Sequence, residues 1–246
     1  MKGKYFIEPL FHAVIEGRKT MMREVVKPPK KAYGGIVVVK NHTGDIIDVC
    51  WADEHERFSD ENGNNNVIKP CYKVGETVYL KEPYFEDYPF TDHATATYKY
   101  NMKREFLEKK PLIKWKTPIT MPSKYARYFI EITSVCVEKL QDISELDAIA
   151  EGVDFLFTEE ECKTTVGLIG TKPSDHGYRN YLWHGLVGNG ITRKQSNNWD
   201  YQYSSYASAK DSYSSLMEKI NGSGTWDANP FVWTYEFKIE NKYNKK

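Results

Sequence analysis

The sequence predicts an α+β protein, in which short helices are interleaved with many strands to form a mixed sheet or an open barrel. Two patterns near the C-terminus indicate the two element types. From 231 to 239, bulky apolar residues alternate with Val, Thr, Glu and Lys, which is typical of a strand with one buried face. Tyr213, Leu216, Met217 and Ile220 instead follow the i, i+3, i+4, i+7 spacing of an amphipathic helix, which Asn221 and Gly222 end.

The chain begins with a short helix. The apolar positions of 8–16 fall on one helical stripe, and Gly17 follows where a left-handed helix end is easiest. Residues 21–26 are predicted to be extended, because β-branched Val25 and Val26 precede two prolines. In such a strand Lys19, Met21 and Arg23 share one face.

The next segments read as strands and loops. Segments 35–41 and 45–51 are rich in strand-forming residues, and the turn sequence between them predicts a hairpin. The charged, Asn-rich stretch 53–66 is predicted to be a solvated loop insertion. Strands are also expected at 77–81, which Pro83 ends, and at 94–100.

The second half contains a long strand, a capped helix and an irregular insertion. Residues 126–137 form a β-like run. Ser144 can cap a helix, with Asp147 in the acidic position of a capping box and Glu151-Gly152 at its end. Segment 155–205 is longer than a compact fold tolerates as a simple connection. We therefore expect one domain over 1–246, in which 155–205 is an insertion, fixed to the body by its aromatic residues and serving as part of a lid or a partner surface.

Composition restricts the possible functions. Lys and Arg (34) balance Asp and Glu (34), so the formal charge is zero and a uniformly basic nucleic-acid coat is excluded. The four cysteines are widely spaced and the six histidines form no ligand motif, so we expect reduced thiols and no metal or cofactor. The sequence has no apolar run long enough for a membrane span or a secretory signal, which predicts a cytoplasmic protein.

Six short motifs occur in a characteristic order: EGRKT (16–20), YKVGE (72–76), MPSKYAR (121–127), LQDI (140–143), AIAEG (148–152), and ING (220–222) with WDANP (226–230). With them the chain resembles ASCH-domain proteins, specifically the long form common in bacteriophages and prophages. The resemblance covers nearly the whole chain apart from 53–66 and 155–205. It implies a PUA-like mixed-strand pseudo-barrel with flanking short helices, and a cleft that binds RNA or a modified nucleoside. For a phage-encoded protein the compartment is the host cytoplasm.

The resemblance also implies candidate catalytic residues. In small bacterial ASCH proteins, hydrolysis of an acetylated cytidine amide is attributed to a Lys, a Thr and a Glu. The corresponding positions here are Lys19, Met22 and Glu151. A thioether can neither donate a proton nor attack an amide, and Thr20 is out of register for the missing hydroxyl. The departure at Met22 therefore counts against amide hydrolysis.

The predicted site residues each have a structural alternative. Arg23 can contact phosphate or pair with a carboxylate such as Glu82. Tyr84 can stack on a base or pack inside the protein. Trp226 and Asn229 have a structural role as the first interpretation, in a turn before the last strand. The candidate ligand-binding residues are Arg18, Lys19, Arg23, Lys81, Glu82, Tyr84, Glu151, Trp226 and Asn229.

Three functions follow as hypotheses. The first is a binding module for RNA or a modified nucleotide, in which Lys19 and Glu151 meet across one cleft. The second is a hydrolase that uses Lys19 and Glu151 on acetylated cytidine or on an RNA phosphodiester. The third is a phage accessory protein that binds a protein partner through 155–205.

Overall fold

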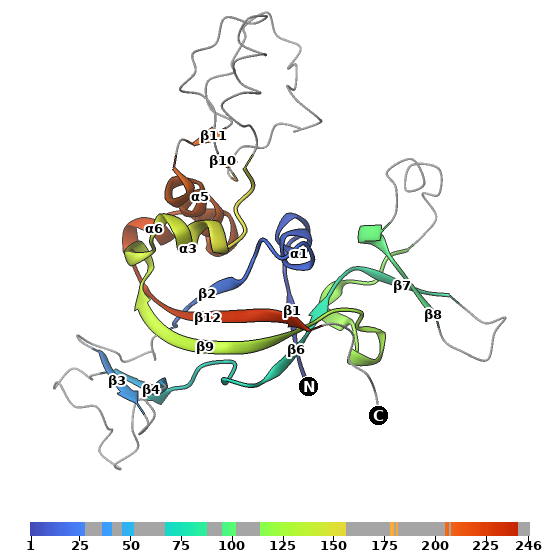
Figure 1. Cartoon of the computed structure of the whole chain (residues 1–246), viewed down its shortest axis with the longest axis horizontal. Coiled ribbons are helices and arrows are strands. Elements are labelled where there is room, and N and C mark those ends of the chain that lie inside the picture. The colour runs from blue at the N-terminus through green and yellow to red at the C-terminus, as the bar shows by residue number, and fades with distance from the viewer. Residues whose placement is uncertain are drawn as a thin grey trace, which may run out of the picture. The chain divides into compact units, whose positions relative to one another are not determined.

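A computed structural model describes residues 1–27, 36–40, 46–51, 67–87, 95–101, 114–155, 178–179, 181, 205–206 and 208–240. It confirms the α+β class (Figure 1). The helices are α1 (Glu8–Ile15), α3 (Glu145–Ala150), α5 (Ala209–Asn221) and α6 (Thr225–Ala228). Short 3-10 turns are η1 (Lys99–Asn101), η2 (Pro118–Thr120), η3 (Ser123–Tyr125) and η4 (Leu140–Asp142). Among the described residues no helix is long and apolar enough to cross a membrane.

The main sheet has five strands in the order β1-β6-β9-β12-β2. Their bounds are β1 (Lys2–Tyr5), β2 (Met21–Val25), β6 (Thr77–Lys81), β9 (Phe129–Lys139) and β12 (Phe231–Glu240). The sheet is mixed, since β1 runs parallel to β6 and β6 runs antiparallel to β9. The order starts at β1 and ends at β2, so the described strands form an open sheet. The closure that a pseudo-barrel requires is not seen among them.

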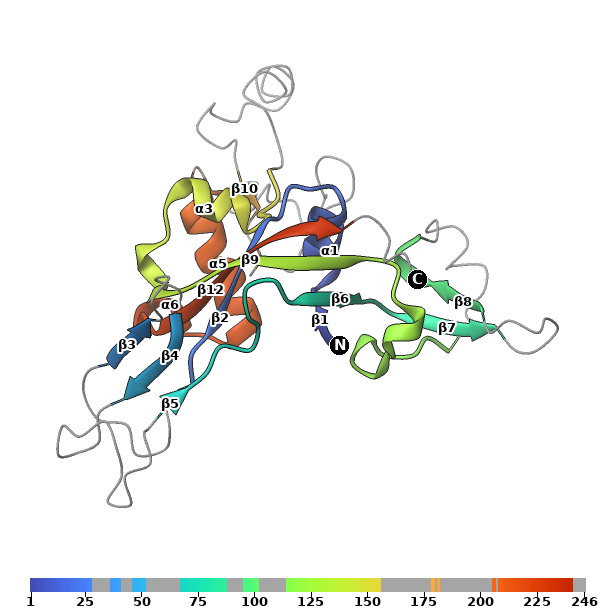
Figure 2. The ribbon, with the colours of Figure 1, turned by 60° about the horizontal axis from the view of Figure 1, so that its bottom comes forward.

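Three smaller sheets accompany the main one (Figure 2). The predicted hairpin is confirmed as β3 (Ile36–Lys40) and β4 (Ile46–Trp51), with β5 (Val67–Ile68) added beside β4. Strand β7 (Tyr84–Asp87) pairs with β8 (Thr95–Tyr98), which is shorter than the predicted 94–100 because Lys99 starts a 3-10 turn. Strand β10 (Tyr178–Arg179) pairs with β11 (Ser205–Tyr206).

Local sequence signals explain the helix ends. The Ser144 hydroxyl accepts a hydrogen bond from the Asp147 amide at 3.1 Å, which confirms the predicted N-cap of α3. Ser208 caps α5 in the same way, through the Asp211 amide. Helix α5 ends at Gly222, whose φ of 105° is a conformation that residues with a Cβ rarely adopt.

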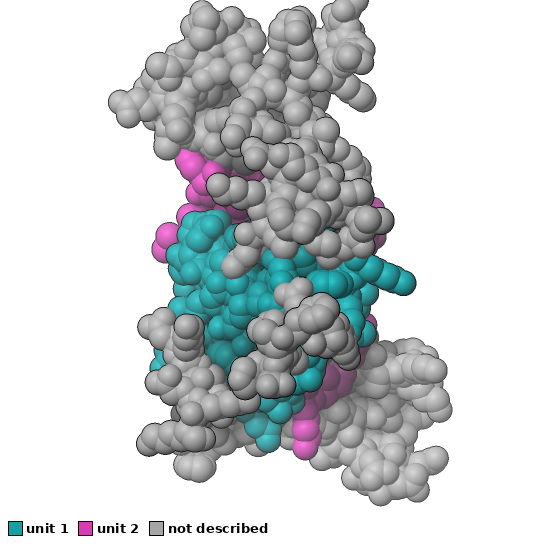
Figure 3. All heavy atoms as spheres, turned by 90° about the vertical axis from the view of Figure 1, so that its right-hand side faces the viewer, with its two compact units in different colours: residues 1–20, 70–135, 235–246 teal, residues 21–69, 136–234 magenta. Residues whose placement is uncertain are grey.

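The chain forms two compact units, coloured separately in Figure 3. Unit 1 comprises 1–20, 70–135 and 235–246, and unit 2 comprises 21–69 and 136–234. Val78, Ile130 and Ile132 belong to the core of unit 1. The core of unit 2 includes Leu140, Ile143, Leu216 and Val232. Apolar burial of this kind is the main favourable contribution to folding.

The predicted loop insertion 53–66 lies outside the described residues, as does most of 155–205. Within the second segment, Tyr181 is 1% exposed. Its amide donates to the Ser215 hydroxyl at 2.9 Å, and its own hydroxyl accepts from the Asp154 amide at 2.9 Å. One aromatic residue of this insertion is therefore fixed to the body of unit 2, as the sequence predicted for the group.

Candidate functional site

Four charged residues are buried in the part of the chain that the structure describes, and all four were predicted as site residues. They are Lys19, Arg23, Glu82 and Glu151, with exposed fractions of 2%, 7%, 0% and 3%. Charged side chains are almost never buried to this extent unless they are paired. Two of the four, Lys19 and Glu151, lie in the motifs that carry the resemblance, and Arg23 and Glu82 lie outside them.

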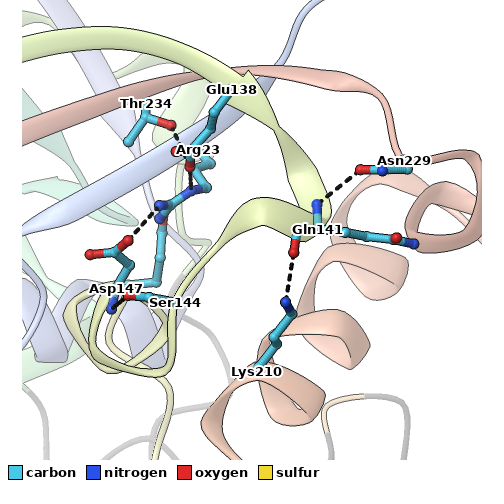
Figure 4. Close-up of polar contacts among 9 residues, drawn as sticks. Arg23, Glu138, Gln141, Ser144, Asp147, Lys210, Asn229 and Thr234 are labelled. Atoms are coloured by element: carbon cyan, nitrogen blue, oxygen red, sulfur yellow. Dashed lines mark hydrogen bonds and ion pairs between the residues drawn. The ribbon is translucent and has the colours of Figure 1, made fainter.

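Arg23 lies at the centre of a carboxylate cluster in unit 2 (Figure 4). Its Nε donates to Glu138 Oε1 at 2.7 Å, and its Nη1 donates to Glu151 Oε1 at 3.1 Å. A longer contact of 3.4 Å joins Nη2 to Asp147 Oδ2. We call Arg23, Glu138, Asp147 and Glu151 the Arg23 cluster. Three carboxylates therefore share one guanidinium.

The elements that bring these residues together are distant in sequence. Arg23 lies on β2, Glu138 near the end of β9, and the remaining two carboxylates on or just after α3. Glu138 also accepts a hydrogen bond of 3.2 Å from the Thr234 hydroxyl on β12. The sheet order places β12 between β2 and β9, so Arg23 and Glu138 meet across the strand that carries Thr234.

The cluster perturbs the groups inside it. Burial lowers the pKa of Arg23, but the negative charge of Glu151, with smaller contributions from Tyr213 and Glu138, raises it above its ordinary value. Burial also raises the pKa of Tyr213 well above its ordinary value, and Glu151 adds to this effect. Arg23 therefore stays charged and Tyr213 stays protonated at neutral pH.

Arg23 pairs with carboxylates, which was one of the two alternatives predicted for it. The partners are the three carboxylates of the Arg23 cluster and not Glu82, which the sequence analysis offered as an example. The Arg23 side chain is fully enclosed. Glu82 instead forms a bidentate ion pair with Arg127 in unit 1. Arg127 Nε donates to Glu82 Oε1 at 2.9 Å, and Arg127 Nη2 donates to Glu82 Oε2 at 2.6 Å.

Two predicted residues near Glu82 serve the packing of unit 1. Tyr84 is 3% exposed and its ring lies 5.6 Å from that of Tyr125, so it packs rather than offering an open stacking face. Lys81 donates to the Ile119 carbonyl at 3.1 Å. Burial raises the pKa of Glu82, and the hydrogen bond and charge of Arg127 oppose that rise.

Lys19 and Arg18 differ sharply in environment. The Lys19 ammonium lies 5.4 Å from the ring centroid of Phe6, within the range of a cation–π interaction. Arg18 is exposed and pairs with Glu16 at 2.8 Å. Lys19 belongs to unit 1 and Glu151 belongs to unit 2. The meeting of these two groups therefore stays a prediction.

Trp226 and Asn229 have the predicted turn role. Asn229 adopts a left-handed conformation with φ of 42°, and its Oδ1 accepts from the Gln141 amide at 2.9 Å. The Gln141 side chain donates in turn to the Trp226 carbonyl at 2.8 Å. Figure 4 shows how Gln141 links Asn229 to Lys210, whose ammonium donates to the Gln141 carbonyl at 2.6 Å. These contacts join the end of β9 to the residues before β12.

Several important residues were missed by sequence reasoning. Glu138 lies one residue beyond the predicted strand 126–137 and had no assigned role, and Asp147 was noticed only for its capping position. Arg127 stood inside a quoted motif but had no assigned role. Each of these residues matters through a partner more than 40 positions away, and no local pattern reveals such a pairing.

The hydroxyl position of the small bacterial ASCH proteins is occupied here by a buried methionine. Met22, at the position of the missing hydroxyl, is 2% exposed. Across the described residues, no group of three or more His, Cys, Asp or Glu side chains is arranged to hold a metal ion. The chemistry present is that of hydrogen-bond acceptors around one cation.

Comparisons with protein-family models, with curated proteins and with solved structures gave no match to this chain.

Proposed function

We propose that the chain binds RNA or a modified nucleotide, and that the Arg23 cluster accepts hydrogen bonds from the amino group of a base. The observation that carries this proposal is the convergence of three carboxylates on one buried guanidinium. The resemblance to ASCH-domain proteins supports it from the sequence side. The coincidence of the predicted residues with the buried charges adds further support.

The charge of the cluster favours a hydrogen-bond donor over an anion. Three carboxylates contact one guanidinium, so acidic groups outnumber the basic one within the Arg23 cluster. The side chains of Glu138 and Asp147 are 27% and 38% exposed, so both carboxylates can be reached from solvent. Carboxylates accept well from the exocyclic amino group of cytosine, whereas a phosphate would be repelled here.

The assignment differs from the first hypothesis in the groups that contact the ligand and in the role of Arg23. Arg23 does not meet the phosphate in this proposal, but holds the carboxylates in position for the base. Because the guanidinium is rigid and enclosed, little conformational entropy is lost when the ligand binds. Arg23 is thus a positioning residue, and Asp147 and Glu138 are the groups that contact the ligand.

The proposal is tested by isothermal titration with cytidine and with uridine, which lacks the amino group. We expect cytidine to bind more tightly, and Asp147→Asn to weaken its binding about tenfold, in the range of a hydrogen bond to a charged group. Asp227→Asn is the matched control, since Asp227 is an exposed acid of the same unit. Equal affinity for both nucleosides, or no effect of Asp147→Asn, would refute the base assignment.

The hydrolase alternative makes a different prediction for acetylated cytidine. With Met22 in place of the hydroxyl, we expect the amide to remain intact during prolonged incubation. Release of acetate by the wild-type chain, abolished by Glu151→Gln and retained by Glu236→Gln, would instead establish an amidohydrolase.

A further inference from the structure

We infer that a lysine-rich surface of unit 1 contacts the phosphate backbone of single-stranded RNA. The inference rests on the proposed function for its choice of ligand, and it narrows that ligand from a nucleotide to a polynucleotide. The residues involved differ from those of the Arg23 cluster. We call them the basic surface: Lys81, Lys99, Lys114, Lys116, Lys124 and Arg127.

Three chain segments bring the basic surface together. Strands β7 and β8 pair with Tyr84 opposite Tyr98, and an isolated bridge joins Tyr84 to Lys116 on the segment that leads to β9. The Lys99 amide donates to the Pro83 carbonyl at 3.0 Å. Lys81 reaches the same segment through its bond to the Ile119 carbonyl. The basic residues therefore come from neighbouring parts of one small substructure.

A tyrosine core lies beneath these cations. Tyr84 and Tyr125 pack together with Met121, and Tyr98 donates its hydroxyl to the Tyr125 carbonyl at 2.7 Å. One cation lies over each ring. Measured to the ring centroid, Lys116 Nζ lies 5.7 Å from Tyr84, Lys124 Nζ 4.7 Å from Tyr125, and Arg127 Cζ 3.9 Å from Tyr98.

This support orients Lys116 and Lys124 through their aromatic neighbours. An aromatic ring attracts a cation through its quadrupole and carries no net charge, whereas a carboxylate would neutralise the ammonium. Lys124, Lys116 and Lys114 are all exposed. A side chain held in one direction loses less entropy when a ligand binds. The surface is therefore both positively charged and partly preorganised.

The local charge contrasts with that of the whole chain. Within 78–87, 95–101 and 114–128, the six residues of the basic surface stand against three acids, Glu82, Glu86 and Asp87. Glu82 is buried and paired with Arg127. Segment 114–128 itself contains four basic residues and no acidic one. A chain of zero formal charge thus concentrates positive charge where a polyanion can lie.

The aromatic content favours a single strand over a duplex. Trp115 lies between Lys114 and Lys116 in sequence and is half-buried. An exposed ring can stack on an unpaired base, and aromatic residues interleaved with cations are typical of surfaces that follow a single strand. In a duplex the bases are already stacked on one another.

The test uses the full chain and a fluorescein-labelled oligouridine of about twelve nucleotides, followed by fluorescence anisotropy. Uridine lacks the exocyclic amino group that the base assignment requires, so binding of this probe does not depend on that group. We expect Lys114→Gln with Lys124→Gln to weaken binding about tenfold. The slope of log Kd against log salt should fall by about 1.4, which corresponds to two lost phosphate contacts.

Lys73→Gln with Lys219→Gln is the matched control, because both lysines are exposed and the net charge changes equally. Unchanged binding in the Lys114 and Lys124 variant, tighter binding of a duplex of equal length, or no binding of oligouridine by the wild type would overturn the inference. Loss of oligouridine binding in that variant, together with equal affinity for cytidine and uridine, would sustain the inference and refute the base assignment alone.

Discussion

At the scale of single residues, the buried charges carry most of the functional argument. Burying an ion pair adds little net stability, because desolvation of both groups offsets their attraction. Removing one partner is costly, since the other charge is left buried and alone. Removing a single residue of the Arg23 cluster or of the Glu82–Arg127 pair should therefore destabilise the fold, although apolar residues could replace the whole group without loss of stability. That combination is typical of functional sites, where chemistry rather than stability decides the residue.

Glu82 provides a pH prediction at this scale. Its folded-state pKa lies above the ordinary value of 4.5, so its contribution to stability is fully present below pH 4.5 and is lost as pH rises through the folded pKa. Glu82→Gln cannot titrate. The wild type minus Glu82→Gln difference in the free energy of unfolding should therefore decrease as pH rises from acid to neutral, as measured by urea denaturation.

The control for this experiment is Glu236→Gln, an exposed residue of the same unit. Its difference from the wild type should show no such decrease. If the wild type minus Glu82→Gln difference in the free energy of unfolding instead increased with pH, Arg127 would lower the pKa of Glu82 by more than burial raises it.

The sequence predicted the buried charged residues of the candidate site but not the residues with which they pair. Lys19 and Glu151 lie in recognisable motifs, and Arg23 and Glu82 were predicted as site residues although they lie outside them. The partners of Arg23 were not predicted, because Glu138 and Asp147 approach it from 115 and 124 positions away. Tyr84 was offered as a stacking face, yet packing against Met121 and Tyr125 buries it.

At the scale of elements, local sequence patterns predicted individual helices and strands. The order of the strands in the sheet depends on pairing between residues far apart in sequence. The single buried face predicted for 231–239 is found only in part, because Val232 and Thr234 are buried as well and Ile239 is exposed. The cap at Ser144 and the hairpin of β3 and β4 are visible within a dozen residues of sequence. The order β1-β6-β9-β12-β2 is not, because strand neighbours such as β2 and β12 are about two hundred residues apart. Twist and hydrophobic pattern constrain each strand but do not name its neighbour.

Asn229 provides a prediction at the element scale. It combines a left-handed backbone with a side-chain hydrogen bond to the Gln141 amide. Asn229→Gly keeps the conformation and loses the hydrogen bond, at a cost of about 1 kcal/mol. Asn229→Ala loses both, at a cost of about 2 kcal/mol. Urea denaturation should therefore show the wild type to be the most stable, Asn229→Gly less stable and Asn229→Ala the least stable.

The same series tests whether Asn229 also binds the ligand, as first proposed from the sequence. The glycine variant should fold and should bind cytidine like the wild type if the role of Asn229 is structural. Weakened cytidine binding in a fully folded glycine variant would restore Asn229 to the list of ligand-binding residues. Equal stabilities of the two variants would show that the left-handed conformation costs alanine nothing here.

At the scale of the whole molecule, the boundaries between the units fall inside continuous strands. The boundary at 135/136 lies within β9, and the boundary at 234/235 lies within β12. Unit 1 is assembled from three separate stretches of sequence and unit 2 from two. Neither unit corresponds to one contiguous segment. Because a strand that loses its pairing on one side of such a boundary also exposes the residues on the other side, we expect the two units to unfold in one transition.

The tryptophans allow this expectation to be measured. Trp115 belongs to unit 1, whereas the positions of Trp51, Trp183, Trp199, Trp226 and Trp233 fall within unit 2. In a Trp115→Phe background, tryptophan fluorescence therefore reports on unit 2 alone.

Ile132→Ala then removes buried apolar volume from unit 1, at a cost of about 3 kcal/mol. If the units unfold together, this substitution lowers the urea midpoint of the unit 2 fluorescence, and circular dichroism gives the same midpoint. A fluorescence midpoint that does not move while circular dichroism shows an earlier step would mean that the units unfold independently, and binding to each unit would then have to be measured separately.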